Sequence, residues 1–227
     1  MFELQVHDQI HVLRMQTGEN RFNRVSLDAL NDALDRVERS DFPTALVTCG
    51  EGKFYSNGLD LDWMAGAGQQ AAIDNVQAVH ALLGRMLTFP VITVAALNGH
   101  AFAAGAMFAL AHDYRVMRTD RGYFCLPEVD IQIPFTRTMN ALILARLPNT
   151  TAHEAMTTGQ RYTAAQALER GIVQRTASEQ EVLGEAIALA TSLAGKHRPT
   201  LSKIKRAAYA GVLECLAQDR ADPTGLG

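Results

Sequence analysis

The sequence has few cysteines, and they follow no pattern. Its three cysteines, Cys49, Cys125 and Cys215, lie far apart in the 227-residue chain and form no C-x-x-C pair. This spacing indicates neither a zinc site nor a disulfide framework. Other metal-binding side chains do not cluster at ligand spacing either, so we expect no metal ion. Unpaired cysteines are typical of a reducing compartment, and we therefore expect a cytoplasmic protein.

The sequence also lacks a basic excess and a long apolar run. It has 21 Lys and Arg against 24 Asp and Glu, a net charge of −3, which gives no electrostatic reason to expect nucleic acid or an anionic membrane as partner. The apolar run at residues 91–97 is soon broken by Asn98 and Gly99, so it is too short to span a membrane. The chain opens directly into a strand pattern and shows no secretory signal.

What the sequence does contain is short apolar runs that alternate with helical patterns. Apolar residues make up 48% of the chain, enough for the core of one domain. The alternation predicts the α/β class. Strands are expected at residues 2–6, 10–15, 45–49, 91–97, 114–118 and 172–173, the first two as a hairpin. Helices are expected after an N-cap at Ser26, from about residue 104, and at residues 69–89, 136–147, 152–158, 164–170, 179–194 and 199–217, with a loose end at residues 220–227.

Residues 98–128 hold the densest set of features. Small residues, among them Gly99, Ala104 and Gly105, follow a predicted strand, and small residues allow a ligand to approach the backbone closely. A helix that begins near Ala104 has free N–H groups at its start, and these groups together with the helix dipole favour an oxyanion. The same residues also suit close packing of a helix against a strand, so both interpretations stay open.

Residues 53–61 form a second such stretch, K-F-Y-S-N-G-L-D-L, again after a predicted strand. Gly58 lies at the turn, and the backbone N–H of Asn57 can face a ligand there. Because Asn-Gly is a common turn pair, an ordinary strand-to-helix turn is the alternative.

Five motifs, in this order, resemble the crotonase family, the enoyl-CoA hydratase/isomerase superfamily. They are G-K-F-Y-S-N-G-L-D-L, A-L-N-G-H-A-F-A-A-G, H-D-Y-R-V-M, L-P-E-V-D-I and G-Q-R-Y-T-A-A-Q-A-L-E-R-G-I-V. The resemblance extends from residue 2 to about residue 215. It implies a crotonase-like (ClpP/crotonase) spiral of β-β-α units in residues 1–195. A shortened C-terminal helical region of the same domain, residues 196–227, then builds a homotrimer or a dimer of trimers.

The resemblance also implies a chemistry. In this family two backbone N–H groups bind the thioester oxygen of an acyl-CoA, and the matching positions are Asn57 and Ala104. Hydratases of the family use two glutamates, but the first position here is Met107 and only the second, Glu128, is acidic. One carboxylate suffices for a double-bond shift, so the pattern is closest to Δ3,Δ2-enoyl-CoA isomerases of fatty-acid β-oxidation. Glu128 is then the sole acid/base, and no cofactor is needed beyond the CoA of the substrate.

Further residues are carried over as substrate-binding positions. For Arg21 a solvated loop charge is the alternative, and for Glu128 a surface acid. Enoyl-CoA hydratase or acyl-CoA hydrolase activity, or non-catalytic binding of acyl-CoA, are the other functions that the sequence allows. The predicted substrate-binding set is Arg21, Asn23, Lys53, Ser56, Gly58, Leu59, Asp60, Leu61, Gly99, Gly105, Met107 and Pro127.

Overall fold

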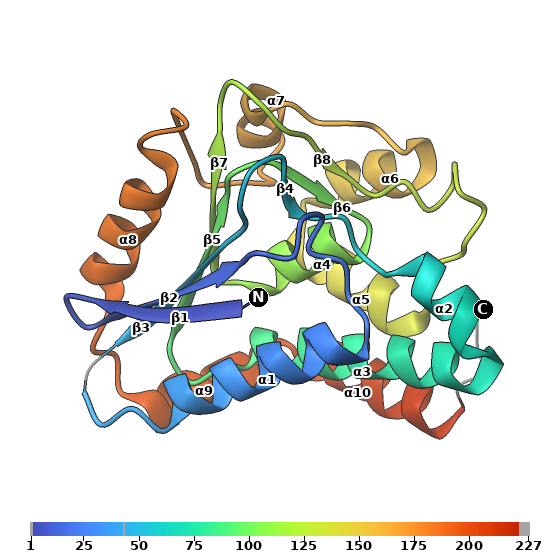
Figure 1. Ribbon diagram of the computed structural model, residues 1–227, viewed down its shortest axis with the longest axis horizontal. Helices are drawn as coiled ribbons and strands as arrows, with labels where there is room; N and C mark the ends of the chain where they lie inside the picture. The colour runs from blue at the N-terminus through green and yellow to red at the C-terminus, as the bar shows by residue number, and fades with distance from the viewer. Residues whose placement is uncertain (1, 43, 223–227) are drawn as a thin grey trace.

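Strands and helices alternate through the computed structural model, which describes residues 2–42 and 44–222 (Figure 1). The predicted α/β class is therefore confirmed. The loose end predicted for residues 220–227 is wrong at residues 220 and 221, which are helical, and its last part, residues 223–227, lies outside the described residues. None of the described helices is both long and apolar enough to cross a membrane.

The larger sheet has six strands in the order β1-β2-β3-β5-β7-β9. The first two form the predicted antiparallel hairpin, and the remaining neighbours are parallel. β3 and β5 are buried along their whole length, which is typical of central strands of a parallel sheet and explains their continuous apolar runs. The strands are β1 (Phe2–His7), β2 (Ile10–Met15), β3 (Ala45–Cys49), β5 (Ile92–Leu97), β7 (Tyr114–Arg118) and β9 (Arg175–Ala177).

The prediction of a strand at residues 172–173 is wrong, because the strand in this part of the chain is β9 at Arg175–Ala177. The amides of Ile172 and Val173 both donate to the carbonyl of Ala167, so they close the preceding helix instead of joining the sheet. Pairing with β7 begins only when the amide of Gln174 donates to the carbonyl of Arg115. The two apolar side chains are buried, which explains why a strand was expected there.

A second, parallel sheet of three short strands positions the site. Its order is β4 (Phe54–Ser56), β6 (His100–Phe102) and β8 (Phe124–Cys125). Each short strand follows one long strand of the larger sheet, β3, β5 or β7, and is itself followed by a helix. This repeated succession of strand, strand and helix is the β-β-α spiral that the resemblance implies.

The helices cover the two faces of the larger sheet unequally. α8 packs against β3, β5 and β7 and forms a small apolar cluster on one face, whereas most of the core lies on the other (Figure 1). There α4 is buried over all of its residues. The helices are α1 (Arg24–Glu38), α2 (Leu61–Ala67), α3 (Gln69–Leu87), α4 (Ala104–Ala111), α5 (Arg137–Arg146), α6 (Asn149–Thr158), α7 (Ala164–Glu169), α8 (Val182–Leu193), α9 (Arg198–Ala208) and α10 (Ala210–Ala221).

Two helix predictions need correction. The N-cap of α1 is Asn23, not Ser26, because the Asn23 side chain accepts from the Ser26 amide while the Ser26 hydroxyl accepts from the Asn23 amide. The single helix expected at residues 199–217 is two helices, which meet at Tyr209. The Tyr209 hydroxyl contacts the guanidinium of Arg146, the last residue of α5.

The two C-terminal helices are fixed to the body by buried charged groups. The Lys205 ammonium on α9 donates to the carbonyls of Phe89 and Val91, both at 3.0 Å, and to the Asp113 carboxylate at 2.6 Å. Asp219 on α10 accepts from the backbone amide of Thr138 at 2.9 Å. The described part of residues 196–227 is thus packed on the spiral core, and its separation as a distinct region stays a prediction.

The Asn23 cap gives a test of the first helix. Asn23→Ala removes the acceptor for the Ser26 amide, and also the donor to Asp60, which lies 2.8 Å away. We expect the free energy of unfolding to fall by about 1 kcal/mol, as is usual for loss of an N-cap. Urea denaturation measures the change, and Asn23→Ser, which keeps a capping oxygen, should lose less. Equal stability of the alanine variant and the parent protein would show that this cap contributes nothing.

Candidate active site

A cavity of about 260 Å³ lies between the start of α4, the 57–61 segment and the residues that lead into α5. Its wall is mainly apolar, with side chains that include Leu59, Val76, Phe102, Ile133 and Met139. Only a few polar groups interrupt this wall, which is the usual construction of a small-molecule site. The polar residues that line it are Arg21, Asn57, Glu128 and Thr136.

The start of α4 supplies the first polar group, a backbone amide. Ala104 is the first residue of the helix, so its N–H has no partner within the helix. Ala103 before it has φ 50° and ψ −127°, a backbone conformation that residues with a side chain rarely adopt. The Ala103 amide donates to the carbonyl of Cys125 at 3.1 Å, and this bond to β8 helps to hold the strained turn. The helix start at Ala104 confirms the sequence prediction.

The 57–59 turn lies directly against this helix start. Gly58 has φ +82°, and a Cβ added to it would lie 3.0 Å from the Ala104 amide nitrogen. Only glycine permits both the backbone conformation and the close approach. The Phe22 amide donates to the Gly58 carbonyl at 2.7 Å, and the Asp60 amide donates to the Phe22 carbonyl at 3.1 Å. This parallel bridge is centred on Leu59 and leaves the Leu59 N–H without an acceptor among residues 2–42 and 44–222.

The prediction that the Asn57 N–H belongs to the oxyanion hole is therefore wrong. That N–H donates to the Glu19 carbonyl at 2.9 Å, and the Asn57 side chain donates to the Glu19 carboxylate at 2.8 Å. The loop before α1 thus occupies the group that the sequence assigned to the ligand. The N–H groups of Leu59 and Ala104, two residues that line the cavity, have no acceptor among residues 2–42 and 44–222. Leu59 was predicted only as a substrate-binding position.

Glu128 is the one acidic residue among the described residues that line the cavity. Its side chain is only 5% exposed, and Oε2 has no hydrogen-bond partner in the described part of the chain. Burial raises the pKa of this carboxyl to about 7, which its own backbone N–H only partly offsets. A buried acid with a free oxygen and a pKa near neutrality is suited to give and take a proton. The surface-acid alternative for Glu128 is thereby excluded.

Arg21, Leu61 and Pro127, three of the predicted substrate-binding residues, also line the cavity. Arg21 is not free to bind an anion unless it changes partner, because its guanidinium contacts the carboxylates of Glu19 at 2.6 Å and Asp62 at 2.8 Å. These contacts hold the Arg21 side chain, which is 32% exposed, beside the cavity.

Other predicted binding residues have structural roles near the cavity but are not among those lining it. Asn23 caps α1, and Asp60 caps α2, a helix that the sequence pattern did not predict. Ser56 is fully buried and donates to the Asn20 carbonyl at 2.7 Å. Lys53 is exposed, with its ammonium 5.3 Å from the centroid of the Phe54 ring.

The small residues and Met107 complete the predicted set. A Cβ on Gly105 would lie 2.4 Å from the Ser56 carbonyl oxygen, and one on Gly99 would lie 2.1 Å from that of Lys53, so both glycines serve close packing between segments. Met107 has no exposed surface and belongs to the main apolar core. Its side chain is not among those lining the cavity.

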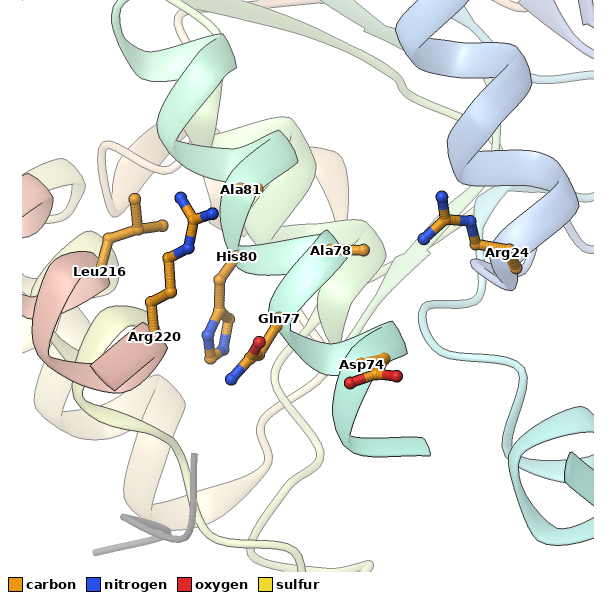
Figure 2. Close-up of a pocket in the computed structure, with 8 residues that line it drawn as sticks. All are labelled: Arg24, Asp74, Gln77, Ala78, His80, Ala81, Leu216 and Arg220. Atoms are coloured by element: carbon orange, nitrogen blue, oxygen red, sulfur yellow. The ribbon is translucent and has the colours of Figure 1, made fainter. Parts of the chain in front are cut away.

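Sequence reasoning missed one polar residue of the cavity, Thr136. It is the N-cap of α5, and its hydroxyl lies 2.9 Å from Nε2 of His80 on α3. The capping position was visible as a threonine at the start of a helical pattern, but nothing near it in the sequence indicates the partner on α3. His80 also lines a second pocket, of about 380 Å³, between α3 and α10 (Figure 2). That pocket contains none of the predicted site residues.

Comparison with known proteins shows the family of the chain. The family described as enoyl-CoA hydratase/isomerase matches residues 6–223. Enoyl-CoA delta isomerase 3 of Arabidopsis thaliana is 38% identical over 185 residues, 78% of either chain, and the peroxisomal enoyl-CoA delta isomerase 2 of the same plant is 35% identical over 188 residues, 79% of this chain and 78% of that one.

The crystal structure of a probable enoyl-CoA hydratase from Mycobacterium tuberculosis superposes with a TM-score of 0.90 at 27% identity. It covers 99% of this chain and 96% of the other. Both the predicted crotonase fold and the predicted superfamily are confirmed, and the chain belongs to the enoyl-CoA hydratase/isomerase family.

Proposed function

We propose that the protein is a Δ3,Δ2-enoyl-CoA isomerase. The observation that carries the proposal is a single buried carboxylate, Glu128, in one mainly apolar cavity with two unengaged backbone N–H groups, those of Leu59 and Ala104. This combination suits removal of a proton next to a thioester, because the charge that develops on the thioester oxygen needs donors and a low dielectric constant. The relatives named enoyl-CoA delta isomerase support the same reaction.

The reaction needs one acid/base group and one anion site. The Glu128 carboxylate takes a proton from C2 of a 3-enoyl thioester, and the electrons move into an enolate whose oxygen accepts from the Leu59 and Ala104 N–H groups. Each such donor typically contributes on the order of 3 kcal/mol to the transition state. Glu128, now protonated, returns the proton at C4, and the double bond lies between C2 and C3. Because the donors are backbone groups, the proposed chemistry uses no metal ion and no cofactor.

A double-bond shift fits the cavity better than a two-glutamate hydration. The position that holds the second acid in hydratases is Met107, and its side chain is packed in the core. The remainder of the cavity wall is largely apolar and suits an acyl chain. We propose fatty-acid β-oxidation as the setting for this reaction. The cytoplasmic location stays a prediction, and the name of one Arabidopsis relative includes the word peroxisomal.

Glu128→Gln tests the assigned base. The amide keeps the size and polarity of the side chain but cannot accept the C2 proton, so we expect kcat for isomerisation of 3-enoyl-CoA to fall by about 10²–10⁴-fold or more. KM should change little, because the oxyanion donors are in the backbone. The conjugated 2-enoyl product is followed by its absorbance, and Glu169→Gln, the same change on the exposed surface of α7, is the control. Near-normal turnover by Glu128→Gln would refute the mechanism.

The raised pKa of Glu128 also predicts a pH-dependent cost to stability. In the folded protein Glu128 holds its proton up to about pH 7, whereas in the unfolded chain it loses the proton near pH 4.5. The free energy of unfolding therefore falls as the pH rises between these two values. Glu128→Gln removes the cost, and we expect the variant to be more stable at pH 8 by on the order of 3 kcal/mol. Denaturant unfolding at pH 4.5 and pH 8 measures this, and a difference that does not grow with pH would contradict the burial argument.

We also propose that the protein assembles as a trimer or a dimer of trimers. Support comes from family membership and from large apolar side chains that are exposed in the single chain, such as Ile204 on α9 at 61% and Leu144 on α5 at 53%. Sedimentation equilibrium at micromolar concentration should give three or six times the monomer mass. A stable monomer under these conditions would overturn the proposal.

A further inference from the structure

Asn75 on α3 carries a buried side-chain oxygen that no described residue satisfies. Its side chain is only 2% exposed, and its Oδ1 accepts no hydrogen bond from residues 2–42 and 44–222. An unsatisfied buried oxygen lowers the free energy of unfolding, and asparagine is also a weak helix former inside a helix. The mechanism through Glu128 does not use this side chain. The reason for an asparagine here therefore lies in the nitrogen of the same amide group.

The Asn75 nitrogen holds one backbone carbonyl. Nδ2 donates to the carbonyl of Phe22 at 3.1 Å. A carbonyl can only accept, so the nitrogen of the amide group faces it and the oxygen does not. That carbonyl already accepts from the Asp60 amide, also at 3.1 Å, so it has a partner without the asparagine. The bond from Asn75 is an additional tether of the Phe22 backbone to α3.

Phe22 contacts both elements that carry the proposed oxyanion donors. Its backbone pairs on either side of Leu59, because the Phe22 amide donates to the Gly58 carbonyl at 2.7 Å and its carbonyl accepts from Asp60. Its ring is fully buried and packs edge-on against Phe108 of α4, with the two centroids 5.7 Å apart and the ring planes at 79°. The position of Phe22 therefore relates the turn that carries the Leu59 N–H to α4.

The other contacts of the loop before α1 show what the tether adds. The Asn57 amide donates to the Glu19 carbonyl at 2.9 Å, which joins this loop to the same turn that carries the Leu59 N–H. Such bonds allow the loop and the turn to move together. Asn75 belongs to a separate helix, and the next residue of that helix, Val76, lines the cavity. The tether thus fixes the loop and the turn to a wall of the cavity.

We propose that Asn75 is a positioning residue for the two N–H groups of the oxyanion hole. It holds the Phe22 carbonyl to α3, and the Phe22 backbone sets where the Leu59 N–H lies relative to the first turn of α4. The proposal rests on the proposed isomerase function, because it requires an enolate at this site. Asn75 acts through Phe22 and does not touch the reacting groups. The unsatisfied oxygen is then the stability cost of a donor that is kept for its position.

A displacement of the Leu59 N–H affects the transition state more than the bound substrate. Negative charge develops on the thioester oxygen only as the C2 proton leaves, so a misplaced donor weakens binding of the enolate-like state most. Complete loss of one such donor typically lowers kcat about 10²–10³-fold, and a donor that is only loosened should cost less, about tenfold. KM should change little, because ground-state binding depends less on this donor.

Asn75→Leu separates positioning from stability, because the two effects have opposite signs. Leucine has a similar size, and it removes the donor to Phe22 together with the unsatisfied oxygen. We expect kcat for isomerisation of 3-enoyl-CoA to fall about tenfold with KM little changed. The midpoint of urea denaturation should equal or exceed that of the parent protein, because an unsatisfied oxygen is lost and leucine is a better helix former.

Asn31→Leu on α1 is the matched control. The Asn31 side chain also donates to one backbone carbonyl, that of Leu27 at 3.0 Å, but its oxygen is satisfied by the Arg85 guanidinium at 2.9 Å. This variant should therefore lose stability and keep kcat, the reverse of Asn75→Leu. Asn75→Ala adds no atoms and takes the place of the leucine variant if that one does not fold, and its kcat and KM then decide.

A second measurement separates this inference from the isomerase function. Deuterium uptake from D2O at C2 of a saturated acyl-CoA reports enolate formation without a double-bond shift, because Glu128 exchanges the proton that it removes with solvent. We expect Asn75→Leu to slow this exchange about tenfold as well. Exchange that depends on Asn75 in a protein without isomerisation would overturn the isomerase function alone, and absence of both reactions in the parent protein would overturn both proposals.

Two further outcomes would overturn the positioning role and leave the isomerase function intact. The first is isomerisation and exchange at parent rates in the Asn75 variants. The second is a loss of kcat in Asn75→Leu that is accompanied by a lower urea midpoint, or a change in KM alone, since either result would mean that the Asn75 side chain only stabilises the fold.

Discussion

The close approach of the 57–59 turn to the first turn of α4 is the constraint on which the site depends. Gly58 lies so near the Ala104 amide that a single added carbon would contact its nitrogen at 3.0 Å. This approach places two backbone N–H groups, those of Leu59 and Ala104, at the same cavity. Backbone donors held by two separate β-β-α units need no reorganisation when charge develops, which is why such sites stabilise oxyanions well.

The spiral architecture makes this approach possible. Three strands of the larger sheet, β3, β5 and β7, each lead into one short strand of the second sheet, and the short strands β4 and β6 are parallel neighbours. The segments that follow these two strands, the 57–59 turn and the start of α4, therefore emerge at the same edge. Ala103 is held there in a strained conformation by its bond to Cys125 of β8, so all three short strands contribute to the geometry of one amide.

Burial provides the second requirement, a carboxyl group that can exchange its proton near neutral pH. Glu128 gains no partner for Oε2 from the described residues, and the resulting cost to stability is typical of a functional group, not of a structural one. α10 brings Asp219 to α3 and α5, where its Oδ2 accepts from the Thr138 amide at 2.9 Å and lies 3.8 Å from Nδ1 of His80.

The sequence by itself determined the order of the motifs, and with it the family, the alternation of strands and helices, the helix start at Ala104 and the acid Glu128. These are properties of short segments, in which spacing, small residues and periodicity carry the information. The tertiary structure alone decided which donors are free. Asn57 and Leu59 lie in one turn, yet their N–H groups differ. The Glu19 carbonyl, far away in the chain, accepts from the Asn57 N–H, whereas the Leu59 N–H has no acceptor in the described part of the chain. Likewise Thr136, His80 and Asp219 are widely separated in sequence. Hydrogen-bond partners and burial depend on contacts between distant segments, and a linear pattern does not contain them.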